Sequence, residues 1–304
     1  MRCSVIIPAY NSESTIVETL RSIVPSLRAE DEVLVIDDGS RDETSTRADG
    51  VDPRVRILRV RNGGVARARN LGIREASGEL VAFCDADDIW KPEKLERQRR
   101  AFRDRPQLGL CFTDYEVISS DGTVLVRSAR RDRALPEDHD LVSMLRVNPV
   151  MTSSAVALKR VVEEAGGFPT DISYGEDIAL WLEIAARRPV AMLPEVLASY
   201  RLVSTSITRS SDPEIARRGR IDLIRRVSER HADRVKPRQA RRAIADYCYR
   251  CAYEDLTHGA RRRAGRYLLR SLREAPFAHP KAYAHLALLP LRRPAAAVGG
   301  GAGG

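Results

Sequence analysis

Three carboxylates follow a short apolar run in the first third of the chain. Residues 81–84 are all apolar, which is typical of a parallel strand buried on both faces, and Asp85, Asp87 and Asp88 follow directly. Neighbouring carboxylates repel one another, so either protons or a cation must relieve the repulsion. Hard oxygen ligands favour Mg²⁺ or Mn²⁺ over zinc. The alternative is an acidic turn that caps the following helix, and these residues alone leave both interpretations open.

A second acidic pair, Glu176 and Asp177, opens a predicted helix. The helix is predicted from apolar residues that recur with helical spacing: Ile178, Trp181, Leu182 and Ala185. Acids in a first turn stabilise the positive end of a helix by ~0.3–1 kcal/mol, which is the purely structural explanation of this pair.

Strand and helix patterns alternate along the chain. In the first part, strands are predicted at residues 2–8, 32–37, 55–60 and 80–84, and helices at 12–24 (capped by Asn11 or Ser12) and 65–76. Later strands are predicted at residues 108–118, 123–126, 153–158 and 190–202, and helices at 91–105 and 138–147. This alternation implies a parallel sheet whose strand ends bind ligands, and the acids lie at such ends. Dinucleotide and P-loop fingerprints are missing from the sequence.

The composition indicates a globular protein. Of the 304 residues, 43% are hydrophobic and 31% are charged. No apolar run approaches the ~20 residues of a membrane span, and a strand pattern begins at once without a signal peptide, so we expect a cytoplasmic protein. The five cysteines are expected to be reduced and buried, and Cys248 and Cys251 have no second pair with which to bind zinc.

The positive charge belongs to the C-terminal third. Residues 201–304 contain 23 Lys and Arg against 9 Asp and Glu, a net charge of +14, whereas residues 1–200 contain 28 against 33, a net charge of −5. We predict a domain at 1–212, a basic helical segment at 213–293 and a disordered tail at 294–304. The basic segment suits anionic lipid, a phosphorylated acceptor or, least of all, nucleic acid, and a solvated helical surface explains it equally well.

Five motifs occur in an order that resembles a known family. They are VIIPAYN, VIDDGSRDET, NGGVARARNLGI, SGELVAFCDADDIWKPEKL and YGEDIALWLEIA. Together they resemble the inverting family 2 glycosyltransferases of the GT-A fold over residues 3–205. The resemblance implies an α/β fold with a mostly parallel sheet flanked by helices, followed here by the helical C-terminal segment.

The resemblance also implies a nucleotide-binding role for the first two motifs. Pro8, Ala9 and Tyr10 match the loop that receives the base, and the Tyr10 ring is available to stack on it. Alternatively, that ring only plugs the sheet edge. Asp38 matches the acid that binds a uracil-type base, although an Asx-turn also places Asp before Gly-Ser. Asp37 is expected to assist the ribose or to hold the loop.

The third motif is expected to approach the phosphates. Asn62, Gly63 and Gly64 let the backbone come close to the ligand, and either Arg67 or Arg69 is available to face a phosphate. Taken singly, each arginine is better explained as a solvated surface residue.

The fourth and fifth motifs carry the expected chemistry. By resemblance, Asp87 binds Mn²⁺ or Mg²⁺ in the sequence Asp85-Ala86-Asp87, Asp85 supports the ribose or the water shell of the metal, and Asp177 is the general base. Glu176 is expected to orient the loop or the acceptor. Asp88 is interpreted as a helix-capping acid.

One departure from the family concerns the last catalytic strand. Many relatives have a His shortly after the Tyr-Arg pair, whereas Leu202 and Val203 follow Tyr200-Arg201 here. Arg201 or Arg209 is therefore considered as the group that covers the phosphates, and the strength of metal dependence stays open.

The resemblance implies an inverting hexosyltransferase-type enzyme. It would move a sugar from a nucleoside diphosphate sugar, UDP- or dTDP-linked, to a hydroxyl of a glycan, lipid-linked or small-molecule acceptor, with peripheral membrane contact through the basic helices. A first alternative is a non-catalytic scaffold that docks on a membrane or an acidic partner. A second is a sugar-1-phosphate nucleotidyltransferase, which needs a Gly-rich, Arg-containing loop where this chain has PAYNSES.

Overall fold

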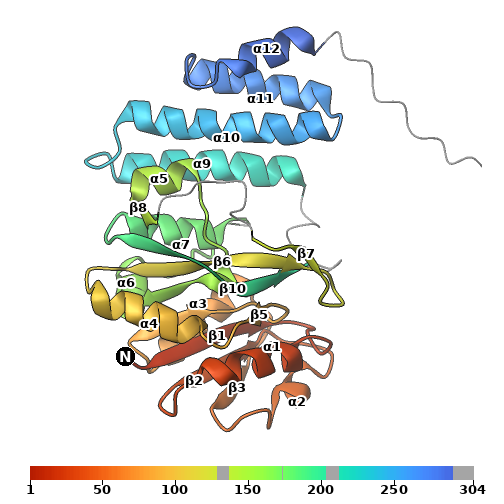
Figure 1. Ribbon diagram of the computed structural model, residues 1–304, viewed down its shortest axis with the longest axis vertical. Helices are drawn as coiled ribbons and strands as arrows, with labels where there is room; N and C mark the ends of the chain where they lie inside the picture. Colours follow the sequence, from red (N-terminus) through yellow and green to blue (C-terminus); the bar gives the residue numbers. More distant parts are fainter. Residues whose placement is uncertain (129–136, 173, 203–211, 290–304) are drawn as a thin grey trace, which may run out of the picture. The chain divides into compact units, whose positions relative to one another are not determined.

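Four parallel strands form the first half of a mixed sheet in this computed structural model, which describes residues 1–128, 137–172, 174–202 and 212–289 (Figure 1). They are β1 (Cys3–Ala9), β2 (Glu32–Asp37), β3 (Val55–Arg59) and β4 (Leu80–Phe83), in the order β3-β2-β1-β4. All residues of β2 and β4 are buried, as the apolar runs predict. The four predicted strands are confirmed.

The second half of the sheet contains antiparallel pairs. Beyond β4 the order is β9 (Val156–Leu158), β6 (Leu110–Ile118), β10 (Val190–Arg201) and β5 (Ile89–Trp90), with β7 (Val124–Val126) beside β6 and β8 (Asp138–His139) beside β10. Strand β9 is antiparallel to both β4 and β6, whereas β6 and β10 are parallel. Strands β1 to β4, β6 and β10 run in one direction and β5, β7, β8 and β9 run against them, so the sheet is mixed with most of its strands parallel, as expected.

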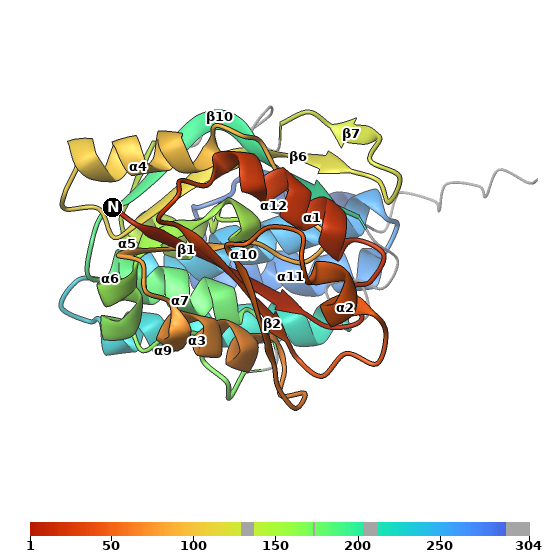
Figure 2. The same ribbon diagram turned by 90° about the horizontal axis from the view of Figure 1, so that it is seen from below.

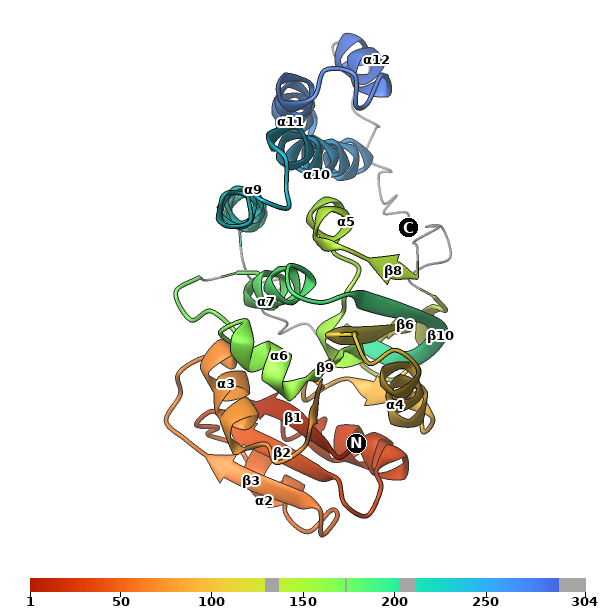
Figure 3. The same cartoon turned by 90° about the vertical axis from the view of Figure 1, so that its left-hand side faces the viewer.

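Helices cover both faces of this sheet. Figures 2 and 3 show α1 (Ile16–Ile23) and α4 (Lys94–Asp104) on one face, and α3 (Val65–Glu75), α6 (Lys159–Glu164) and α7 (Glu176–Ala185) on the other. Glycine lets α3 approach closely, because a Cβ on Gly72 would lie 2.4 Å from Cγ2 of Ile6 in β1. The short α2 (Thr44–Ala48) follows β2.

Several predicted helix boundaries were wrong. Helix α4 begins at Lys94 because the residues before Pro92 form β5 against β10, and the segment expected as a helix at 138–147 begins with β8 before α5 (Leu141–Arg146). Helix α1 begins after Thr15 without a side-chain cap, so neither Asn11 nor Ser12 caps it. The predicted strand at 153–158 begins with the 3₁₀ turn η2 (Thr152–Ser154).

An aromatic cluster joins β4 to α7. The rings of Phe83, Phe168 and Trp181 meet edge to face with centroids 5.2–5.8 Å apart, and all three are buried. Phe83 ends β4 immediately before the acidic loop, and Trp181 lies on the helix that Glu176 opens. This cluster therefore holds the two acidic motifs on one rigid core.

The chain divides into two compact units. One contains Met1–Met144 and Asn148–Ala216, and the other contains Leu145–Val147 and Arg217–Gly304. The helices that follow the sheet are α9 (Pro213–Arg230), α10 (Pro237–Thr257), α11 (Arg261–Glu274) and α12 (Lys281–Leu288). The predicted tail at 294–304 and Arg209 lie outside the described residues.

The helical unit has its own core and its own ion pairs. Buried Asp255 of α10 pairs with Arg217 of α9 and Arg263 of α11, each at 2.7 Å. Cys248 and Cys251 are buried on α10, and all five cysteines are free thiols, as predicted. None of the described helices is both long and apolar enough to cross a membrane.

Candidate active site

The acidic loop after β4 is anchored by a buried carboxylate. Asp88 is fully buried and accepts hydrogen bonds from Ser153 Oγ and from the Arg201 backbone N–H at 2.9 Å. The prediction that Asp88 caps a helix was wrong, because α4 begins only at Lys94. Burial, followed by the charges of Asp85 and Asp87, raises the pKa of Asp88 well above its ordinary value. Asp88 therefore fixes the loop.

Asp87 lies on the same loop with its carboxylate partly accessible. Burial, followed by the charge of Asp85, raises the pKa of Asp87 to about 6. The charge of Arg201 lowers this pKa but does not offset burial and the charge of Asp85. A divalent cation with oxygen ligands fits such a place, although no three His, Cys, Asp or Glu side chains of the described residues converge as a metal cage.

Arg69 of α3 joins the two acidic motifs. Its guanidinium is buried and donates through Nη2 to Asp85 Oδ1 at 2.7 Å and through Nη1 to Glu176 Oε1 at 3.0 Å. The side chain also lies 5.2 Å from the centroid of the Phe168 ring. The interpretation of Arg69 as a solvated surface arginine was therefore wrong.

A sequence signal for the burial of Arg69 existed. It shares one face of α3 with Ala68, Gly72 and Ile73, and all four are buried. An arginine on the apolar stripe of a helix needs buried carboxylate partners. Its neighbour Arg67 is exposed on the same helix, as expected for a solvated arginine.

The 3₁₀ turn η2 forms a second link between the motifs. Thr152 Oγ1 donates to Asp177 Oδ2 at 2.9 Å, and the adjacent Ser153 donates through Oγ to Asp88. Consecutive residues thus hold one acid from each motif, which brings the predicted base close to the predicted metal loop. Nothing in the sequence singled out Thr152 or Ser153, because the contacts depend on the fold.

The acids that open α7 differ in their surroundings. Burial, followed by the charge of Asp177, raises the pKa of Glu176, whereas Arg69 opposes this shift. Asp177 is partly accessible, and its Oδ1 accepts the N–H of Ile178 at 2.7 Å. Gly175 precedes both acids with φ +81°, a conformation that favours glycine.

Three loops meet at the carboxyl ends of β1, β2 and β3. Both carboxylate oxygens of Asp38 accept backbone N–H groups, from Gly63 and Gly64, each at 2.8 Å, and Asn62 Nδ2 donates to the Asp38 carbonyl at 2.9 Å. The Asp38 N–H in turn donates to the Ala9 carbonyl at 2.8 Å. The predicted base-binding and phosphate-binding segments are thus brought together.

Tyr10 projects from this junction, with 46% of its surface exposed. Pro8 before it is half-buried at the end of β1. Asp37 accepts the N–H of Ser40 at 2.8 Å and lies 3.6 Å from Arg59, so it holds the loop, which was one of its two predicted roles.

The backbone of the acidic loop after β4 is held at two further points. The Ala86 carbonyl accepts hydrogen bonds from Thr15, just before α1, and from Thr19 of α1, at 2.8 and 3.0 Å. Arg201 is only 3% exposed and donates to the carbonyls of Asp87 and Ser120. Arg201 therefore holds the loop instead of covering phosphates, because its guanidinium already donates hydrogen bonds to oxygens of the protein.

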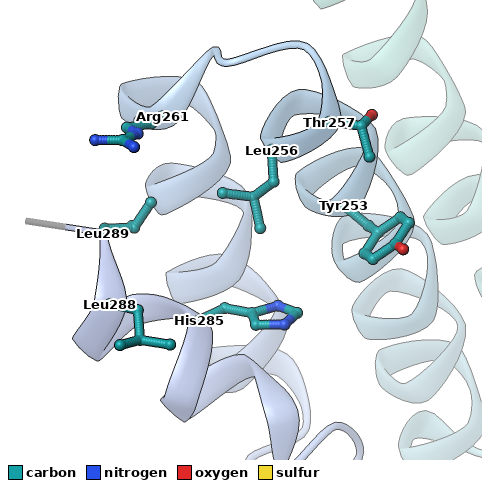
Figure 4. A pocket seen from close by; sticks show the side chains of 7 residues that line it. All are labelled: Tyr253, Leu256, Thr257, Arg261, His285, Leu288 and Leu289. Carbon is teal, nitrogen blue, oxygen red and sulfur yellow. The ribbon is translucent and has the colours of Figure 1, made fainter. Parts of the chain in front are cut away.

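A pocket of about 220 Å³ belongs to the helical unit and contains none of these residues (Figure 4). Its lining comes from α10, α11, α12 and the residue after α12: Tyr253, Leu256, Thr257, Arg261, His285, Leu288 and Leu289. The two acidic motifs and the loops after β1, β2 and β3 all belong to the other unit.

Sequence comparisons agree on one family. Residues 4–165 match the model described as glycosyl transferase family 2. One relative is TuaG of Bacillus subtilis (strain 168), which is provisionally named a teichuronic acid biosynthesis glycosyltransferase. The chain is 32% identical to it over 211 residues, which cover 67% of this chain and 81% of TuaG. It is 29% identical, over 70% of its length and 82% of the partner's, to the Escherichia coli UDP-Glc:alpha-D-GlcNAc-diphosphoundecaprenol beta-1,3-glucosyltransferase WfgD. It spans only 33% of a longer glycosyltransferase from Rickettsia conorii that is 30% identical.

Solved structures show the same fold at low sequence identity. TarS 1-349 of S. aureus in complex with UDP-GlcNAc superposes with a TM-score of 0.66 at 19% identity, over 95% of this chain and 89% of that one. The mannosyltransferase PcManGT of Pyrobaculum calidifontis in complex with GDP-Man and Mn²⁺ gives a TM-score of 0.56 at 21% identity, over 96% of this chain and 76% of that one. With its ordered motifs gathered at one sheet edge, the chain belongs to glycosyl transferase family 2 and is a glycosyltransferase of the GT-A fold.

Proposed function

We propose that this glycosyltransferase moves a sugar from a nucleoside diphosphate sugar to an acceptor hydroxyl, with inversion at the anomeric carbon. The observation that carries the proposal is the bridge of Arg69 between Asp85 and Glu176. This bridge supports the proposal because Asp85 belongs to the loop proposed to hold the diphosphate and its metal, and Glu176 belongs to the turn proposed to serve the acceptor. A single in-line displacement needs both groups within one sugar's length of each other.

The donor nucleotide is proposed to bind where the loops of β1, β2 and β3 meet. The exposed Tyr10 ring is available to stack on a base, and Asp38, held by Gly63 and Gly64, is available to accept a hydrogen bond from it. We favour uridine or thymidine. The UDP-GlcNAc complex of TarS supports uridine, and the GDP-Man complex of PcManGT keeps guanosine open.

Asp87 is proposed to hold Mn²⁺ or Mg²⁺ directly, with Asp85 supporting the ribose or the water shell. The cation would complete its coordination with diphosphate oxygens and water, as Mg²⁺ commonly does, and would neutralise the leaving diphosphate. Three features of the chain are consistent with a cation site at this loop. Asp88 and Arg201 fix the loop, and Ala86 is hydrogen-bonded at the start of α1. Burial and the charge of Asp85 raise the pKa of Asp87, and a bound cation would stabilise its ionised form.

Asp177 is proposed as the general base. It would take the proton from the acceptor hydroxyl as that oxygen attacks the anomeric carbon. Thr152 holds its Oδ2 at 2.9 Å, which leaves further lone pairs of the carboxylate for the acceptor. Glu176, tied to Arg69, fixes the first turn of α7 and so orients Asp177.

The acceptor is proposed to be a glycan or a lipid-linked sugar. The name of TuaG refers to teichuronic acid biosynthesis, and the name of WfgD specifies a diphosphoundecaprenol-linked acceptor. A lipid-linked acceptor would place the enzyme at the cytoplasmic side of a membrane, with the basic helices providing peripheral contact. Small-molecule acceptors remain an alternative within the same chemistry.

Two other functions are less well supported. A non-catalytic scaffold would not need the two independent links, through Arg69 and through η2, that bring the acids together. A sugar-1-phosphate nucleotidyltransferase would need a Gly-rich, Arg-containing loop after β1, where this chain has PAYNSES.

The deciding experiment measures release of nucleoside diphosphate from a panel of UDP-, dTDP- and GDP-sugars, with Mn²⁺ and with EDTA. Slow hydrolysis of one donor that requires Mn²⁺ would support the proposal. If no donor binds the wild-type chain by calorimetry in the presence of Mn²⁺, the scaffold function is favoured. Release of diphosphate from a nucleoside triphosphate and a sugar phosphate would instead favour the nucleotidyltransferase.

A further inference from the structure

Helix α11 presents a row of arginines that the fold of the helical unit does not use. Its inward face is made of Ala264, Tyr267, Leu268 and Ser271, all of them buried. Arg262, Arg266, Leu269 and Arg273 lie about 180° away around the helix and are all exposed. The outward face of α11 therefore consists of three arginines and one leucine, whereas the inward face has no charged residue.

These three arginines differ from several other arginines of the helical unit. Arg217, Arg225 and Arg263 each pair with an acid of a neighbouring helix. No acidic side chain of the described residues lies within ion-pair distance of Arg262, Arg266 or Arg273. The only acid of α11, Glu274, faces Arg225 and Arg241 instead.

Two exposed apolar side chains belong to the same stretch of the chain. Leu269 is 58% exposed at its centre, and Phe277, four residues past Arg273, is 90% exposed between α11 and α12. Among the exposed large apolar side chains of the described residues, Phe277 has the highest exposed fraction, so its ring is available to enter an apolar phase. Arginine heads with apolar side chains among them match the interface of a bilayer, where phosphates and acyl chains are adjacent.

We propose that the outward face of α11, with Phe277, docks this protein on an anionic lipid bilayer. The guanidinium groups of Arg262, Arg266 and Arg273 bind lipid phosphates, for which the planar, bidentate arginine head is suited. Leu269 and Phe277 enter the headgroup region. This inference deepens the proposed function by naming the surface behind the membrane contact, but its evidence is the charge and exposure of α11 and not the transferase site.

The test measures co-sedimentation of the full chain with vesicles of phosphatidylcholine containing 30% phosphatidylglycerol. The test variant is Arg262→Gln/Arg266→Gln/Arg273→Gln. The matched control is Arg97→Gln/Arg100→Gln/Arg103→Gln, which removes the same charge from the exposed face of α4. Each arginine near an anionic surface contributes about fivefold to partitioning, so the test variant should bind on the order of 100-fold more weakly. The control should bind like the wild type.

A second variant separates the apolar contribution from the charge. Leu269→Ser/Phe277→Ser keeps all arginines, and its binding should become more sensitive to salt than that of the wild type, because only the electrostatic part is screened. Equal losses in the α4 and α11 triple variants would overturn the proposal, as would wild-type binding that needs no anionic lipid. Duplex DNA that displaces the protein from vesicles at equal phosphate concentration would also overturn it, in favour of a nucleic-acid surface.

Two readouts keep these outcomes interpretable. Circular dichroism melting of each variant should match the wild type, since all the replaced side chains are exposed and the ion pair of Arg103 with Asp104 lies on the surface, where such pairs contribute little. Donor hydrolysis in detergent-free buffer should also be unchanged in both triple variants. Vesicle binding contains no donor, so an inactive transferase would not affect it, and a failed lipid assay would leave the transferase proposal standing.

Discussion

Asp85 and Glu176 bind the same guanidinium, at 2.7 and 3.0 Å from Nη2 and Nη1 of Arg69. Asp85 follows the strand β4, and Glu176 opens the helix α7, so a single buried side chain of α3 sets the spacing between two motifs that are remote in sequence. The neighbouring turn η2 repeats the connection through Thr152 and Ser153. The geometry of the site therefore depends on residues that do no chemistry themselves.

Replacing Arg69 should damage stability and the site together. Arg69→Gln leaves Asp85 and Glu176 without their cation, which should lower the free energy of unfolding by about 2–4 kcal/mol. Urea denaturation measures this loss, and Arg74→Gln, an exposed position on the same helix, is the control. The double variant Arg69→Gln/Glu176→Gln should recover about 1 kcal/mol or more, because it removes the uncompensated charge. Strictly additive effects would contradict the bridge.

Asp87 should be required for metal-dependent donor binding. Asp87→Asn keeps the shape but removes the anionic ligand, so Mn²⁺ should strengthen nucleotide binding much less than in the wild type. Loss of even an outer-shell group costs about 10–100-fold in metal affinity, and a direct ligand should cost at least as much. Isothermal titration of UDP with and without Mn²⁺ measures the effect. Asp104→Asn, at the exposed end of α4, should behave as the wild type, and an unaltered Mn²⁺ effect in Asp87→Asn would remove Asp87 from the metal site.

Asp177 and Thr152 should affect turnover in a graded way. Asp177→Asn should leave donor binding nearly intact and lower the transfer rate by about 10²–10⁴-fold, the usual contribution of a general base. Thr152→Val removes one hydrogen bond to the same carboxylate, so a loss of about 3–10-fold is expected, in line with ~1 kcal/mol. Single-turnover transfer with a saturating donor separates the rate from binding. Retained turnover in Asp177→Asn would eliminate it as the base.

Lys94 predicts a pH dependence of stability. The side chain is fully buried, where its Nζ donates to Gln98 at 2.9 Å and lies 3.9 Å from the centroid of the Trp90 ring. Burial lowers the pKa of Lys94 from 10.5 to about 8. Because the unfolded chain holds the proton more tightly between these two values, this group favours folding increasingly as the pH rises from about 8 to 10.5.

The comparison with Lys94→Met tests this sign. At pH 7 the variant should be more stable than the wild type by about 1–3 kcal/mol, because it no longer buries a charge. The difference between the two proteins should shrink as the pH rises toward 10. Chemical denaturation at pH 7, 8.5 and 10 measures it, and a difference that does not change with pH would contradict the lowered pKa.

The local sequence determined the strands and the order of the motifs. Runs of apolar residues within β1, β2 and β4 predict strands, and that of residues 81–84 predicts burial on both faces; the structure confirms these strands because such runs are stable only inside a covered sheet. The ordered motifs identified the family, since their combined spacing is far more specific than any one of them. Where local pattern and tertiary pairing compete, as at β8, the sequence predicted a helix where a strand forms.

The contacts that assemble the candidate site depend on tertiary structure. Asp88 has the sequence context of a helix cap but becomes a buried anchor, because β10 and η2 supply its donors. Arg69 resembles a surface arginine until the fold of α3 against the sheet buries it between two carboxylates. Side-chain type and spacing thus specified which groups could do the chemistry. Only the packing of distant elements decided which of them meet, because a charge can be buried only where the fold brings its partner.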